Sequence, residues 1–169
     1  MAVPPMLAVF LSVLLLTTVA AAAEEIQGID VEGSAAFITR TGEALALLRG
    51  TESFQVVKPY ISIIKEGEHS GMWASLPKPT YEVGEVTWKR SAVWFAGSIV
   101  HDGYHSKLFH DGKKWTDSQA ETDCLKIQAQ ALREMHADPA DVAYVEKLEP
   151  HPESYTGAGT KADYKARSW

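Results

Sequence analysis

Apolar residues recur every three or four positions in several stretches of this chain, the spacing that gives a helix one apolar face. Residues able to cap a helix precede most of these stretches, and Gly50 and Pro150 end the first and the last. Pro59 interrupts the second stretch, by a kink or by a restart of the helix. The pattern predicts helices over residues 41–50, 53–64, 91–109, 118–135 and 138–149.

The pattern between residues 67 and 90 is different. Residues 72–74 predict a short strand within a segment broken by glycine and proline, and TYEVGEVTW at 80–88 predicts one or two more, with Gly84 as a bulge or turn. Residues 91–109, in contrast, are apolar on nearly every side, which is typical of a helix buried at the centre of a domain. We therefore expect an α+β domain that is mostly helical, with a short sheet over this central helix.

Both ends of the chain look different from its middle. The apolar run MLAVFLSVLLLTTV is followed by alanines in an A-x-A pattern, which indicates a secretory signal peptide over residues 1–23, cleaved after Ala22 or Ala23. An uncleaved membrane anchor is the alternative. Export to the periplasm or the extracellular space is then expected. We interpret residues 24–40 as a linker and lead-in, 41–149 as one folded domain and 150–169 as a flexible tail.

Charge and cysteine content narrow the function classes. The net charge is −6, from 16 Lys and Arg against 22 Asp and Glu, so we expect no nucleic-acid binding and no binding to anionic membranes after signal cleavage. Cys124 is the only cysteine, so an intrachain disulfide is impossible. We interpret Cys124 as a buried packing residue in preference to a metal ligand.

The candidate chemistry begins with the motif H-D-x-x-H at residues 101–105. Two histidines four residues apart on a helix lie on the same face and can share one Zn²⁺ ion. The acidic residue after the first histidine, Asp102, is placed to take a proton from a metal-bound water. His101 and His105 are therefore the predicted zinc ligands, and Asp102 is the predicted base.

A zinc site of this kind needs a third protein ligand. Glu121 is the candidate, because Leu125, Gln128 and Leu132 continue the same helical face and point its carboxylate toward the interior. Glu121 also ends a predicted capping box that begins at Ser118, and a capping role alone is the alternative. His110, Asp111 and Asp117 are weaker ligand candidates, and Tyr81 is a possible oxyanion donor.

The helix at residues 91–109 has a structural rival. Asp102-Gly103 is also a strong two-residue hairpin signal, which would make AVWFAGSIV and YHSKLF two paired strands. In that fold His101 and His105 would flank a turn, and the argument for a shared metal would fail. We favour the helix, because a single glycine costs a helix only about 1 kcal/mol.

The stretch SIVHDGYHSKLF, followed by AETDCLKIQAQAL, resembles zinc metallopeptidases of the gluzincin group. In these enzymes an H-E-x-x-H helix supplies two histidines and a following helix supplies a glutamate. The resemblance implies a zincin-like core, with His101, His105 and Glu121 as the ligands. Asp102 stands where the family has its catalytic glutamate. This departure changes the predicted catalytic base and leaves the predicted metal ligands unchanged.

These observations together predict a zinc-dependent, metallopeptidase-like hydrolase that acts on peptides or proteins. The alternative is an exported metal-binding or interaction domain with weak or no catalysis. A third possibility, tied to the hairpin, is a binding module without metal.

Overall fold

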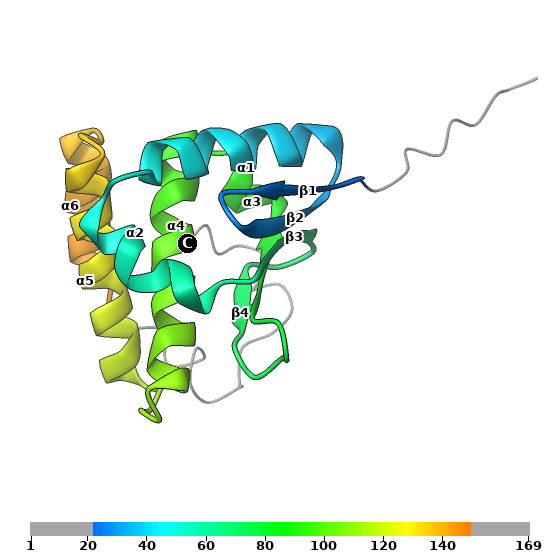
Figure 1. The fold of residues 1–169 in the computed structure, drawn as a ribbon. Coiled ribbons are helices and arrows are strands. Elements are labelled where there is room, and N and C mark those ends of the chain that lie inside the picture. The colour runs from blue at the N-terminus through cyan, green and yellow to red at the C-terminus, as the bar shows by residue number, and fades with distance from the viewer. Residues whose placement is uncertain (1–21, 150–169) are drawn as a thin grey trace, which may run out of the picture.

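A computed structural model describes residues 22–149 (Figure 1). Its sheet has five strands in the order β1-β2-β3-β5-β4. The three central strands are parallel, and β1 and β4 are antiparallel at the two edges. The strands are β1 (Ala22–Ile26), β2 (Ile29–Gly33), β3 (Ile63–Gly67), β4 (Gly71–Trp73) and β5 (Thr80–Gly84).

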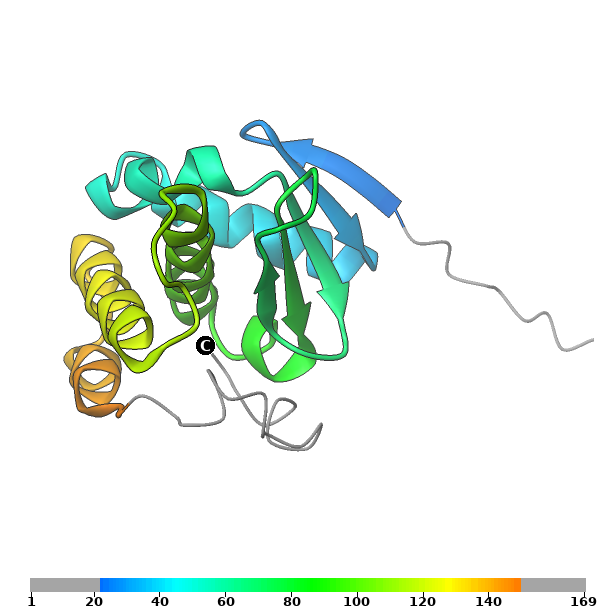
Figure 2. The same ribbon diagram turned by 90° about the horizontal axis from the view of Figure 1, so that it is seen from below.

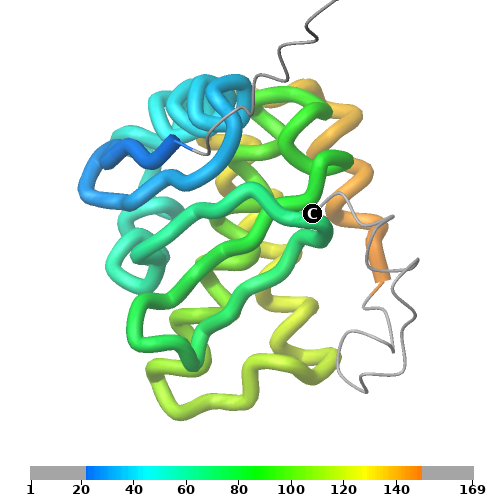
Figure 3. Tube along the Cα trace, turned by 90° about the vertical axis from the view of Figure 1, so that its right-hand side faces the viewer, coloured from blue at the N-terminus to red at the C-terminus, as the bar shows by residue number. Residues whose placement is uncertain are grey.

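Helices cover one side of this sheet and form a second layer beyond it. Helix α4 lies between the sheet and α5, and α6 packs on α5 (Figure 2). From the sheet side, the β1–β2 hairpin lies at one edge and β4 at the other (Figure 3). The helices are α1 (Ala35–Leu48), α2 (Glu52–Val57), the 3₁₀ turn η1 (Lys58–Tyr60), α3 (Glu85–Trp88), α4 (Ala92–His110), α5 (Ser118–Glu134) and α6 (Pro139–Lys147).

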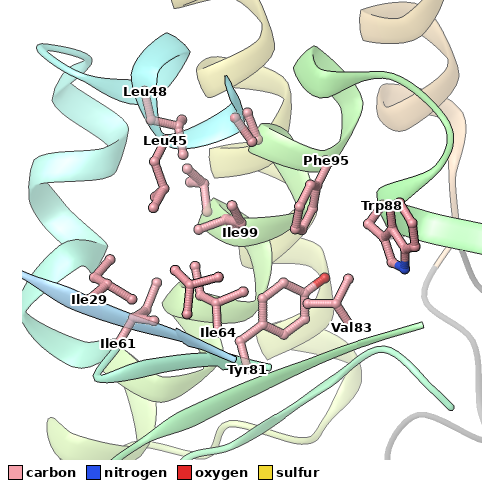
Figure 4. Close-up of a cluster of buried hydrophobic side chains, with 14 of the residues drawn as sticks. Ile29, Leu45, Leu48, Ile61, Ile64, Tyr81, Val83, Trp88, Phe95 and Ile99 are labelled. Carbon is pink, nitrogen blue, oxygen red and sulfur yellow. The ribbon is translucent and has the colours of Figure 1, made fainter. Parts of the chain in front are cut away.

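The main core joins the sheet to α4. Ile64, Tyr81 and Val83 from the strands meet Phe95 and Ile99 from α4, and all five are fully buried (Figure 4). Because its other side packs on α5, α4 is enclosed by protein on both faces. The prediction of a buried central helix is therefore confirmed, and so is the α+β class of the fold.

The hairpin interpretation of Asp102-Gly103 is wrong, since α4 runs unbroken through both residues. The reason for the glycine is packing. A Cβ on Gly103 would lie 2.7 Å from Ile61 Cδ1 and 2.9 Å from Val57 Cβ, so any larger residue would have to displace α2 and the segment after η1 where they cross α4. The third possibility, the binding module built on that hairpin, loses its structural basis.

The interpretation of residues 24–40 as a linker is also wrong. Strands β1 and β2 form a hairpin through Gln27-Gly28, both with positive φ, and α1 begins at Ala35 with Ser34 as its cap, not at residue 41. The signal was present in the sequence, because buried Ile29 and Val31 alternate with more exposed acidic residues. The glycines and acidic residues of this segment concealed that alternation.

Two further boundaries differ from the prediction. The helix expected over residues 53–64 ends as the 3₁₀ turn around Pro59, and Ile63 and Ile64 belong to strand β3. Proline lacks the N–H group that a continuing helix needs. In the same way, only the first half of TYEVGEVTW is a strand, β5, and its second half is the short helix α3.

The signal peptide predicted over residues 1–23 lies outside the described residues, apart from Ala22 and Ala23, which begin strand β1. The tail predicted over 150–169 lies outside them entirely. Within residues 22–149, no helix combines the length and hydrophobicity needed to cross a membrane.

Candidate metal centre

Helix α4 places His101 and His105 one turn apart on the side that faces α5. Their Nε2 atoms are 3.3 Å from each other, and the ring of His101 is almost completely buried. Two imidazoles that approach through the same kind of nitrogen cannot both be protonated there without repulsion. The arrangement leaves at least one Nε2 lone pair available to a proton or a metal ion.

Helix α5 brings the carboxylate of Glu121 to both rings. Oε1 lies 3.4 Å from His101 Nε2, and Oε2 lies 3.3 Å from His105 Nε2. The predicted capping box is wrong, because Asp117 caps α5 by accepting from the Ala120 amide, and Ser118 is the first helical residue. The side chain of Glu121 is therefore not needed as a cap, and its carboxylate is directed at the histidines.

The other ring nitrogen of each histidine has its own partner. His105 Nδ1 lies 2.7 Å from the backbone carbonyl oxygen of Trp115, and His101 Nδ1 lies 3.1 Å from Oε1 of buried Gln128. A carbonyl oxygen only accepts, so each Nδ1 carries a hydrogen and donates it. In a neutral ring the lone pair is then on Nε2, the tautomer that a metal ligand requires.

The two histidines have the spacing of metal ligands, and Glu121 contacts both of them. With bonds of roughly 2.0–2.1 Å in a tetrahedral site, neighbouring ligand atoms lie about 3.3–3.4 Å apart. The two Nε2 atoms lie 3.3 Å apart, which fits one edge of such a site. Glu121 reaches the two histidines through different oxygens, Oε1 at 3.4 Å and Oε2 at 3.3 Å, so its carboxylate bridges the pair. Two imidazoles and a carboxylate are a donor set that suits Zn²⁺.

The charges of these groups support one another. Burial alone would raise the pKa of Glu121, but His101 and His105 outweigh it and hold the pKa of this carboxyl well below its usual range. Burial acts to lower the pKa of His105, whereas Cys124 and Glu121 raise it well above its usual value. Without a metal, a proton on the histidines therefore neutralises the buried carboxylate.

Asp102 follows His101 on α4 and is also buried. Burial raises its pKa, while the nearby histidines act to lower it, so the carboxylate belongs to the same electrostatic cluster. Tyr81 approaches from strand β5, and its hydroxyl donates to Ser98 Oγ at 3.1 Å. Burial and the charge of Asp102 raise the pKa of Tyr81 well above 10, so it stays a neutral phenol.

The weaker candidates are occupied elsewhere. Asp111 pairs with Lys107, Asp117 caps α5, and His110 stacks near Tyr60 and Phe109 at the end of α4. None of these three side chains joins the cluster. The loop between α4 and α5 contacts the cluster through the Trp115 carbonyl, which lies 2.7 Å from His105 Nδ1.

Cys124 is the group that sequence reasoning set aside. It lies on α5 one turn after Glu121 and is fully buried. His101, His105 and Cys124 each have one ligand atom that lies within 4.8 Å of the ligand atoms of the other two. The spacing E-x-x-C, which puts both side chains on one helical face, was the available signal.

A scan against protein-family models gave no match for this chain, and no curated protein or solved structure matches it either. The likeness to gluzincins therefore rests on the quoted residues alone and remains a prediction.

Proposed function

We propose that this chain binds Zn²⁺ through His101, His105 and Glu121 and is a metallopeptidase-like hydrolase. The observation that supports the proposal is the 3.3 Å separation of the two histidine Nε2 atoms, the distance between neighbouring ligands of a tetrahedral zinc site, with the Glu121 carboxylate in contact with both. A zincin-like core, in which a buried histidine helix lies under a mixed sheet, is part of the proposal.

Bound zinc would polarise a substrate carbonyl and acidify a water molecule. The chain's own residues would orient the two imidazole rings and deprotonate the attacking water. The Trp115 carbonyl and Gln128 hold the two imidazole rings with Nε2 toward the metal. Asp102 would accept the proton from the attacking water, a role that its raised pKa suits better than that of an exposed aspartate.

An extended peptide is the proposed substrate because of strand β4. It ends the sheet, packs against α4, and pairs with β5 along one side only among the described strands. A free strand edge binds an extended chain through backbone hydrogen bonds. Trp73 on β4 is 56% exposed, so this strand also offers an apolar side chain that a bound peptide could contact.

A second candidate function is metal binding without hydrolysis. The exposed fractions favour it, because His101, Asp102 and Glu121 are only 2%, 5% and 5% exposed, which leaves a substrate little access. Asp102 is also one methylene shorter than the glutamate of the enzymes that the motif resembles. In this case the ion would join α4 to α5 and stabilise the domain.

The first test is the metal content of the mature protein, purified without a histidine tag or chelator and measured by mass spectrometry. We expect about one zinc per chain. His105→Ala and Glu121→Ala should lose the metal, whereas His110→Ala, a histidine on the same helix outside the cluster, should keep it. A parent protein that takes up no zinc even when zinc is added would contradict both candidate functions.

A peptide-library screen then separates the two functions. Chelator-sensitive cleavage by the parent, increased in Asp102→Glu, would support the peptidase. If neither protein cleaves any peptide while both hold zinc, the peptidase proposal is wrong and the non-catalytic metal site stands.

A further inference from the structure

The thiol of Cys124 shares its surroundings with the proposed metal ligands. Cys124 follows Glu121 by three residues on α5, so both side chains lie on one face of that helix. No part of it is exposed to solvent. Its Sγ and one ring nitrogen from each of His101 and His105 lie within 4.8 Å of one another.

We infer that Cys124 is the fourth protein ligand of the metal. The inference rests on the proposed zinc site, because it adds a ligand to the same ion. With bonds of roughly 2.0–2.1 Å to nitrogen and 2.3 Å to sulfur, a sulfur and a nitrogen ligand lie about 3.5 Å apart in a tetrahedron. A thiol within 4.8 Å of the ring nitrogens therefore needs an approach of at most about 1.3 Å.

The two helices supply matched pairs of ligands. Helix α4 offers its histidines four residues apart, and α5 offers Glu121 and Cys124 three residues apart. Each pair occupies one helical face, and the faces meet where α4 packs on α5. His101, His105 and Cys124 each bring one ligand atom within 4.8 Å of the other two, and Glu121 contacts both histidines, so the cysteine is not an isolated thiol in an apolar pocket.

Apolar packing accounts for only one side of the Cys124 side chain. Leu108 and Ala120 form an apolar cluster with Cys124, so one side of the thiol is in ordinary contact with carbon. The other side faces the histidine rings. On ligation the S–H bond breaks, a sulfur–metal bond forms and the proton passes to solvent.

This assignment has two chemical consequences. A thiolate with two imidazoles selects Zn²⁺, Co²⁺ or Cd²⁺ over Mg²⁺ and Ca²⁺, which prefer oxygen ligands. Four protein ligands also form a closed shell, as in structural zinc sites. Hydrolysis would then require Cys124 to leave the ion, so the thiol would hold the site closed at rest.

The test is a Co²⁺ titration of the purified, reduced full-length chain under anaerobic conditions. The parent should show the visible bands of tetrahedral cobalt together with the intense near-ultraviolet band of a sulfur–cobalt bond. Cys124 is the only cysteine, so this band has no other source in the protein. Cys124→Ala should keep the visible bands, lose the near-ultraviolet band and bind cobalt at least about 10-fold more weakly, since loss of a ligand should cost no less than loss of an outer-shell partner.

The outcomes separate the inference from the proposed function. Visible cobalt bands in the parent without the near-ultraviolet band would overturn the ligation by Cys124 and leave the three-ligand site intact. No cobalt or zinc binding at all would overturn both. The spectrum of the parent decides the matter even where Cys124→Ala fails to fold, and circular dichroism of the metal-free variant shows whether it has folded.

Discussion

Replacing Gly103 by alanine tests the packing that positions the histidine helix. The new Cβ would lie 2.7 Å from Ile61 Cδ1, 2.9 Å from Val57 Cβ and 3.1 Å from Val57 Cγ2. The Ile61 methyl is the end of a flexible side chain and can move. Val57 Cβ is bonded to the backbone, so α2 itself has to shift.

The expected magnitude combines two opposing effects. Alanine in place of glycine stabilises a helix by about 1 kcal/mol, and overpacking a core costs about 1–3 kcal/mol. Because the closest rigid contact is with a Cβ atom, we expect the packing cost to be the larger. With a packing cost in the upper part of that range, about 2–3 kcal/mol, the variant should lose roughly 1–2 kcal/mol of unfolding free energy.

Gly42 provides a matched control. It also lies within a helix, α1, and an added Cβ would only reach an ordinary contact of 3.6 Å with Ile26 Cδ1. Gly42→Ala should therefore stabilise the protein by about 0.5–1 kcal/mol. The two substitutions are chemically identical and are expected to have opposite signs.

Urea unfolding of the metal-free proteins, followed by circular dichroism, measures both effects. The slopes with urea should agree among the three proteins, so that the midpoints report stability. A Gly103→Ala protein at least as stable as the parent, with an unchanged slope, would refute the close approach of α2 to α4.

Two further predictions concern the candidate metal centre. Gln128→Leu, which removes the acceptor for His101 Nδ1, should weaken zinc binding about 10- to 100-fold in a chelator competition, with His110→Ala unchanged. The raised pKa of His105 and the lowered pKa of Glu121 predict that their pairing stabilises the metal-free protein most between about pH 4.5 and 6.5. This contribution is lost as pH falls through the folded pKa of Glu121 and as pH rises through that of His105. Zinc must displace the proton, so its stabilisation, measured as a shift in Tm, should instead grow from pH 6 to 8; a shift independent of pH would contradict the coupling.

The local pattern of the sequence was sufficient for the long helices. Helix α5 carries apolar residues at helical spacing, α4 is apolar on nearly every side, and both follow residues able to cap a helix, so their existence follows from interactions within a few residues. His101 and His105 come together for the same reason, because any helix places residues four apart on one face. The α+β class followed from the strand-forming residues near Tyr81.

Most of the sheet depended on partners far away in the chain. Strand β3 pairs with β2 and β5, and its residues Ile63 and Ile64 taken alone equally suit the end of an amphipathic helix. The β1–β2 hairpin has a weak local signal, because a two-stranded ribbon needs a third strand or a packed helix to be stable. Here β3 and α1 provide both.

The candidate metal centre also depends partly on local sequence and partly on tertiary packing. The sequence by itself determined that two histidines share a helical face and that a glutamate and a cysteine share another. Its pattern predicted that Ser118 caps α5, whereas Asp117 is the cap, because both residue types serve as caps and the choice depends on how the loop closes. Only the packing of α4 on α5 decided that Glu121 points at the histidines and that Cys124 joins them, since those contacts form between helices and not within one.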